Sequence, residues 1–253
     1  LLSNQRDGSF RDVAAEVGLS FNGAATCVAA GDVNKDGFTD FFFGRAEGRG
    51  ALVLSDGRGR FTVADAADET AQASAAQFVD YDQDGLLDLV FLAQGRLRVL
   101  RNLGQRWADV SERAVKAAAN ARFTSRGFAS GDLDGDGATD VIAPDAAGGW
   151  HEWRNQAEAA RHSLRVQLTG RASNRQGVGT KVEVRAGSLS QKLEYYSATP
   201  APAPADLVFG LGQRDTVDVV RLLWPSGNVQ AEFYQAQGTP PRELTLPITE
   251  LDR

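Results

Sequence analysis

The sequence has few of the residue types on which catalytic chemistry commonly depends. Its 253 residues include one cysteine, Cys27, two histidines, His151 and His162, and no methionine. A single cysteine cannot form a disulfide within the chain, and its apolar surroundings in the sequence predict a buried, inert thiol. The histidines belong to no recognisable nucleophile or acid–base motif, so we expect them to pack near a domain junction or to face solvent.

Long apolar runs and basic patches are also missing. No run approaches the roughly 18 apolar residues of a membrane-spanning helix, and no basic segment followed by an apolar one marks an export signal. We therefore expect no transmembrane segment in this chain. The lack of methionine and a start within a repeat predict a mature or excised part of a longer protein. The formal charge of −6, without a stripe of lysine or arginine, argues against a nucleic-acid partner.

What the sequence does contain is one acidic loop in three copies, which begin at residues 32, 80 and 132. The copies are DVNKDGFTD, DYDQDGLLD and DLDGDGATD, and all share the pattern Asp-x-[Asp/Asn]-x-Asp-Gly-x-x-Asp. Oxygen atoms at alternate positions of a tightly curled loop converge on one point, and Ca²⁺ takes about six to eight oxygen ligands. The pattern therefore predicts three calcium sites.

The register assigns one ligand set to all three loops. Side chains at the first, third, fifth and ninth positions and the backbone carbonyl of the seventh would bind the ion. The predicted metal residues are Asp32, Asn34, Asp36, Phe38 and Asp40 in the first loop, Asp80, Asp82, Asp84, Leu86 and Asp88 in the second, and Asp132, Asp134, Asp136, Ala138 and Asp140 in the third. The sixth-position glycines Gly37, Gly85 and Gly137 supply a left-handed backbone. Three divalent cations would also offset the formal charge of the chain.

Two other interpretations of these loops are weaker. An EF-hand loop opens in the same way but needs a bidentate glutamate at its twelfth position, where this chain has Phe43, Phe91 and Ala143. Plain solvated hairpin turns also favour aspartate and glycine. Three copies in matched register, however, each gather carboxylates that would repel one another without a cation. Apolar runs on both sides predict a strand, a calcium loop and a second strand.

A second recurring pattern sets the fold prediction. A polar turn followed by an aromatic residue occurs at Phe10, Phe61 and Trp107, and a partial copy ends at Asn155. Units of roughly 50 residues with four short strands are typical of β-propeller blades, of which closed propellers have about four to eight. The chain supplies about three. Either further blades lie outside it, or the C-terminal region or another subunit covers the open edges.

The pattern changes near His162, where strands alternate with turn residues in a manner typical of an antiparallel β-sandwich or barrel. We therefore predict an all-β chain, with propeller-type repeats over residues 1–158 and a separate β domain over residues 159–253. The glycine clusters at 177–180 and 209–212 predict tight turns rather than phosphate cradles. The proline-rich stretch 198–206 predicts a stiff, exposed loop.

These residues carry two family resemblances. The acidic loops and their strands resemble the FG-GAP or VCBS repeats of integrin α-subunit propellers and secreted bacterial proteins, a likeness that implies calcium binding. The stretches SNRQGVGTKVEV, LVFGLGQRDTVDVVRLLWPSG and RELTLPI resemble the ASPIC/UnbV domain of cartilage acidic protein and its bacterial relatives. This chain departs from the second family in carrying an Ala-Pro repeat before FGLG, so no role of that segment is transferred.

Two classes of function follow from these patterns. The first is a non-catalytic, calcium-stabilised module for protein interaction, adhesion or scaffolding, outside the cell or in the periplasm, where calcium is plentiful. Its partner would be a protein or a larger surface or periplasmic assembly, and a carbohydrate is possible. The second is a domain of an extracellular carbohydrate-active enzyme of the calcium-dependent lyase type, which would require a basic cluster in a cleft.

Overall fold

Each acidic loop joins two strands that pair antiparallel, as the apolar runs around the loops predict. The three hairpins are β3 (Ala25–Gly31) with β4 (Asp40–Arg45), β7 (Ala73–Val79) with β8 (Asp88–Ala93), and β11 (Ala129–Gly131) with β12 (Asp140–Pro144). Side chains of β4 alternate between buried and half-buried, as expected for a strand with unlike faces. The ninth residue of every loop is thus the first residue of a strand.

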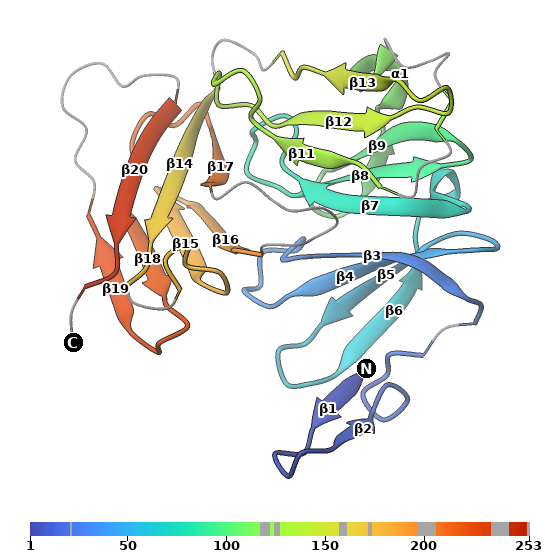
Figure 1. Ribbon diagram of the computed structural model, residues 1–253, viewed down its shortest axis with the longest axis horizontal. Coiled ribbons are helices and arrows are strands. Elements are labelled where there is room, and N and C mark those ends of the chain that lie inside the picture. Colours follow the sequence, from blue (N-terminus) through green and yellow to red (C-terminus); the bar gives the residue numbers. More distant parts are fainter. Residues whose placement is uncertain are drawn as a thin grey trace.

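The computed structural model describes residues 1–20, 22–116, 122–123, 127–156, 161–171, 174–196, 206–233 and 243–251 (Figure 1). Its repeat region forms three sheets, ordered β3-β4-β5-β6, β7-β8-β9-β10 and β11-β12-β13, and the hairpin β1-β2. The further strands are β1 (Leu2–Asn4), β2 (Phe10–Asp12), β5 (Ala51–Ser55), β6 (Phe61–Asp65), β9 (Arg96–Asn102), β10 (Trp107–Asp109) and β13 (Trp150–Trp153). Two short helices, η1 (Asp68–Thr70) and α1 (Ser111–Ala114), follow the first and second sheets.

Apolar side chains pack between neighbouring repeat sheets. Phe42 of β4 and Phe91 of β8 are fully buried in one cluster that joins the first and second sheets. Val99 of β9 and Val141 of β12 belong to a second cluster, which joins the second and third sheets. The first strands of the first two sheets, β3 and β7, lie side by side. The sheets therefore pack against one another like successive blades.

The C-terminal region forms two sheets around a core of its own. One sheet has the order β17-β14-β20 and the other β16-β15-β18-β19. Their strands are β14 (His162–Thr169), β15 (Lys181–Ala186), β16 (Leu189–Glu194), β17 (Asp206–Gly212), β18 (Val219–Leu223), β19 (Val229–Glu232) and β20 (Glu243–Thr249). Trp224 and Phe209 are buried between the sheets, and the Trp224 indole Nε1 donates to Gln230 Oε1 at 2.9 Å. This is the predicted sandwich.

Two details of the C-terminal prediction are wrong. The sandwich is not wholly antiparallel, because β20 runs parallel to β14. A parallel neighbour needs a crossover instead of a hairpin, and β20 follows β19 of the opposite sheet. The cluster at 209–212 is also no tight turn, because it lies within strand β17. The cluster at 177–180 does form a turn, in which Gly177 and Gly179 have φ values of 67° and 86°.

The number of sheets differs from the predicted number of blades. The described strands form five sheets of three or four strands in a propeller-like arrangement, against about three predicted. Three of them come from the repeats and two from the C-terminal region, which lies beside the repeats in Figure 1. The predicted domain boundary and the Ala-Pro segment before residue 206 lie outside the described residues. No helix within the described ranges is long and apolar enough to cross a membrane.

One glycine marks where the C-terminal region meets the repeats. A Cβ atom added to Gly210 of β17 would lie 2.6 Å from Gln83 Cα and would also clash with the Asp80 carboxylate. Two residues later, the Gly212 amide donates to the Gln83 carbonyl oxygen at 2.8 Å. Strand β17 therefore approaches the second acidic loop as closely as backbone atoms allow. This contact, not a turn, accounts for a glycine at 210.

We predict that Gly210→Ala destabilises the chain by about 1–3 kcal/mol, because the new methyl group has no space against the backbone of the second loop. Thermal unfolding in calcium would measure the loss. Gly127→Ala is the matched control, since a Cβ atom there meets nothing within 4 Å. Equal melting temperatures for the two variants would contradict the close approach.

Candidate metal centre

The three acidic loops share one backbone conformation. The sixth-position residues Gly37, Gly85 and Gly137 have φ values of 88°, 91° and 83°, in the left-handed region that the sequence predicts for them. A second left-handed residue stands at the fourth position of each loop, where Lys35, Gln83 and Gly135 have φ values of 61°, 56° and 78°. Two such residues so close together curl the chain tightly. In the third loop this curl brings together the carboxylates of the first, third and fifth positions.

Backbone amides hold the first carboxylate inside this curl. In the second loop the Asp80 oxygens Oδ1 and Oδ2 accept hydrogen bonds from the amides of Asp84 at 3.0 Å and Gly85 at 2.9 Å. The corresponding bonds to Asp32 and Asp132 are between 2.9 and 3.2 Å. The first-position aspartate therefore organises the loop whether or not an ion is bound.

The ninth aspartate ties each loop to its own sheet. One oxygen of Asp88 accepts from the Tyr81 amide of the loop at 3.1 Å, and the other accepts from the Asn102 amide at the end of β9 at 2.7 Å. Asp40 and Asp140 repeat this arrangement, and they accept from the backbone amides of Ser55 and Asn155, respectively. All three ninth-position carboxylates are buried, with at most 1% of each residue exposed.

The asparagines that donate to these carboxylates also connect successive loops. The Asn102 amide Nδ2 donates to the Val33 carbonyl of the first loop at 2.8 Å, and Asn155 Nδ2 donates to the Tyr81 carbonyl of the second. Sequence analysis missed this role. The signal was present, because an asparagine stands at or just after the end of the corresponding strand in both repeats, as Asn102 in β9 and Asn155 two residues after β13.

Carboxylate oxygens converge in two of the loops. One oxygen each from Asp80, Asp82 and Asp88 lie within 4.8 Å of one another, and so do oxygens from Asp132, Asp134 and Asp136. Among the described residues the first loop gives no such group of three, and its third position is the neutral Asn34, whose Oδ1 accepts from the Asp36 amide at 3.1 Å. An all-oxygen donor set at this spacing fits a hard cation such as Ca²⁺.

Electrostatics in the second loop favours a bound cation. Burial, followed by the neighbouring charges of Asp84 and Asp82, raises the pKa of Asp80 to about 8. Burial also raises the pKa of Asp88 to about 9. In the first loop, burial raises the pKa of Asp40 to about 6. Without an ion, these carboxylates hold protons at pH values where isolated aspartates are ionised.

Basic side chains from other segments reach all three loops. Lys192 of β16 donates to the Gly37 carbonyl oxygen of the first loop. Arg101 of β9 pairs with Asp82 at 2.6 Å and with Asp84 at 2.9 Å. Arg165 of β14 pairs with Asp132 of the third loop. Two of these three cations come from the C-terminal region, so part of the loop charge is balanced across the contact between the two regions.

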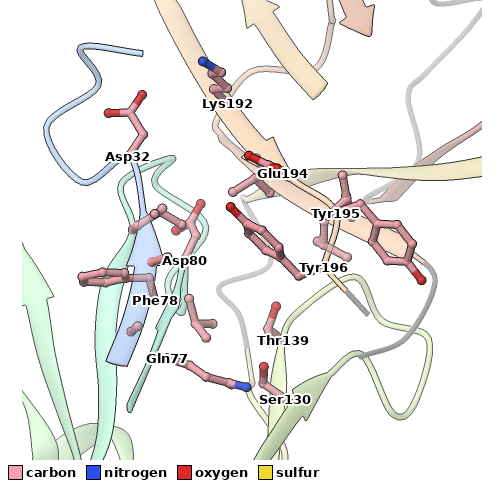
Figure 2. A pocket seen from close by; sticks show the side chains of 18 of the residues that line it. Asp32, Gln77, Phe78, Asp80, Ser130, Thr139, Lys192, Glu194, Tyr195 and Tyr196 are labelled. Atoms are coloured by element: carbon pink, nitrogen blue, oxygen red, sulfur yellow. The ribbon is translucent and has the colours of Figure 1, made fainter. Parts of the chain in front are cut away.

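The loops face the C-terminal region, while parts of the first and third loops, including Asn34 and Asp134, remain exposed. A cavity of about 250 Å³ separates the two, and the first aspartate of each loop, Asp32, Asp80 and Asp132, lines it. Figure 2 shows Asp32 and Asp80 on one side of this cavity. On the other side it shows Lys192 and Glu194 of β16, followed by Tyr195 and Tyr196. Fourth-position side chains also reach between loops: Gln83 Nε2 donates to the Gly137 carbonyl at 2.5 Å.

The histidines and the cysteine lie away from the acidic loops. His151 of β13 contacts Asp145 at 3.0 Å and stacks on Trp153, with ring centroids 5.8 Å apart. His162 begins β14 near the junction of the two regions, as expected. Cys27 is half-buried in β3, and burial raises the pKa of its thiol, which favours the unreactive protonated form.

Comparison with known protein families agrees with this division of the chain. A family model described as FG-GAP-like repeat matches residues 32–91 and 80–143, which span the three loops. A second model, described as ASPIC and UnbV, matches residues 170–239. No curated protein matches the chain.

We predict unequal effects of two substitutions in the third loop when calcium is removed by a chelator. Asp140→Ala deprives the partly buried amides of Leu133 and Asn155 of their acceptor and should cost about 1–3 kcal/mol. Asp134→Ala loses an exposed pair with Arg154 at 3.7 Å and an exposed hydrogen bond from the Asp136 amide at 3.3 Å, and it should cost less than about 1 kcal/mol. Urea unfolding measures both. Equal costs would contradict the anchoring role of the ninth position.

We also predict that the stability of the calcium-free chain falls as pH rises. The pKa values of Asp80 and Asp88 are raised to about 8 and about 9 in the folded chain, from the ordinary aspartate value of 3.8. Between these limits the folded chain binds more protons than the unfolded one, so the free energy of unfolding decreases with pH. Urea unfolding at pH 5 to 9 in chelator tests this. Asp88→Asn should flatten the slope; a rising or unchanged stability in the parent chain would refute the prediction.

Proposed function

From a chain that carries FG-GAP-like repeats followed by an ASPIC and UnbV domain, we infer a calcium-stabilised interaction module that works outside the cytoplasm. The calcium ions are structural. They bind at the three acidic loops through the first, third, fifth and ninth side chains and the seventh carbonyl, and they hold the repeats and the C-terminal domain in one arrangement.

The observation that carries this proposal is the position of the loops. The C-terminal region contacts all three, with Gly210 against the second loop, Lys192 on the first and Arg165 on the third. An ion bound in these loops would lie next to the contact between two sets of sheets. Carboxylates saturated by such an ion are poor acids and bases, so a structural role suits them better than a catalytic one.

The expected gain in stability is large enough to matter. With millimolar calcium and a dissociation constant of about 0.1 mM, each site contributes roughly 1.4 kcal/mol, or about 4 kcal/mol for three independent sites. This is a substantial share of the stability of a typical domain. Cytosolic calcium would leave sites of this affinity mostly empty, which supports an extracellular or periplasmic location.

The interaction partner is proposed to be a protein, or a surface or periplasmic assembly that contains one. If bound calcium fixes the positions of the repeat sheets, the loops between their strands keep a constant arrangement. Such an arrangement suits the recognition of a protein partner. A stoichiometric partner that co-purifies in calcium and is lost in chelator would support the scaffold role. Turnover of acidic polysaccharides by the purified chain would instead favour the lyase alternative.

Calcium should raise the melting temperature, and three ions should bind per chain. Isothermal titration calorimetry gives the stoichiometry, and thermal unfolding in calcium and in chelator gives the shift. Asp134→Ala is expected to remove one site from the titration and to leave the others, because each loop carries its own set of ligands. Magnesium, which prefers strict octahedral geometry, serves as the control ion. An identical melting temperature in calcium and chelator would overturn the structural role.

A further inference from the structure

A second cavity lies between the second and third repeat sheets, next to Tyr81 and Asp82 of the second acidic loop. Its volume is about 540 Å³, which is within the usual range for sites that bind small organic molecules. Hydrocarbon side chains and one indole line much of it, including Val79, Val90, Leu97, Val99, Val141 and Trp153.

The polar lining of this cavity is mostly basic. Four arginines from four separate segments line it: Arg101 of β9, Arg113 of α1, Arg154 just after β13, and Arg161 just before β14. Among the lining residues that the structure describes, the only carboxylate is Asp82. In a chain with a formal charge of −6, this excess of positive charge is local and sets the cavity apart.

The arginines differ in how far their charge is already balanced. Arg101 is held by Asp82 and Asp84, and Arg161 lies 4.0 Å from Asp82. Arg154 pairs with Glu152 at 2.7 Å in an exposed position. Arg113 donates to the Tyr81 hydroxyl at 3.5 Å, and no carboxylate of the described residues forms an ion pair with it. Arg113 is therefore the cation of this group best placed to receive an anion.

We propose that this cavity binds a small organic carboxylate with an apolar body. The carboxylate would lie at the arginine rim, where guanidinium groups offer paired donors matched to its two oxygens. The apolar body would lie against the valines, Leu97 and Trp153. Phosphates and bare sugars fit less well, because neither uses the hydrocarbon lining. The site goes beyond the proposed scaffold role, and it adjoins the second acidic loop, whose Tyr81 and Asp82 line it.

The direct test is isothermal titration calorimetry of the full chain in millimolar calcium, with 4-phenylbutyrate as the probe. We expect binding of one molecule per chain with a dissociation constant on the order of 0.1 mM. The neutral 4-phenylbutanol, which has the same apolar body, should bind at least about tenfold more weakly. Acetate, which has only the charged group, should give no measurable binding.

Substitutions locate the site. Arg113→Gln should weaken 4-phenylbutyrate binding about tenfold and leave the melting temperature nearly unchanged, because the side chain is exposed. Arg98→Gln is the matched control, since Arg98 is on β9, pairs with Asp109 and lies outside the lining. It removes the same charge and should leave the affinity unchanged. Ala114→Trp should fill the cavity and abolish binding.

Several results would overturn the proposal. These are no binding of 4-phenylbutyrate at millimolar concentrations, equal affinity for 4-phenylbutanol, and equal effects of Arg113→Gln and Arg98→Gln. Tighter binding of galacturonate than of 4-phenylbutyrate would also refute it, because an acidic sugar would then be recognised without the apolar body. All titrations are run in millimolar calcium, so that the second acidic loop, whose Asp82 lines the cavity, is kept in one state.

Discussion

The crowding of carboxylates in the connecting loops of three β-hairpins is the constraint on which the rest of the structure depends. Each loop must keep several aspartates close together, and each does so with backbone amides that point at the first and ninth carboxylates. The mutual repulsion of the charges is then reduced by basic side chains from elsewhere, such as Arg101 and Arg165. A divalent cation would reduce it further, and the donor set suits one.

The same loops connect the parts of the molecule. Within the repeats, Asn102 and Asn155 join each later loop to the one before it. Across the junction, Gly210 allows β17 to reach the second loop, and the Gly212 amide bonds to Gln83. No described C-terminal strand pairs with a repeat strand, so the contact of the C-terminal region is with the acidic loops. The second acidic loop is thus also the contact for another region of the chain.

Local patterns were predictable from the sequence and long-range contacts were not. The hairpins, the left-handed Gly37 and its equivalents, and the succession of short strands all depend on residues within about ten positions of each other. The hydrogen bond that Asn102 Nδ2 donates to the Val33 carbonyl, the parallel pairing of β14 with β20 and the strand conformation at Gly210 depend on segments far apart in the chain. The sequence around Gly210 predicts a turn, because the second acidic loop that Gly210 contacts lies more than a hundred residues earlier in the chain.

The position of Lys35 and Gln83 shows the same limit. Sequence analysis assigns no role to these fourth-position residues, yet both have left-handed backbones, and Gln83 is 1% exposed. Their environment is created by the next loop and by β17, so only the assembled fold assigns them a role.

Amide hydrogen exchange in calcium and in chelator tests the central claim most directly. If calcium holds the loops and thereby seats the C-terminal domain, it will slow exchange both at loop amides such as Gly85 and at the Gly212 amide, which bonds across the junction. Protection that is the same with and without calcium, or that changes in the loops while Gly212 stays unaffected, would contradict the account.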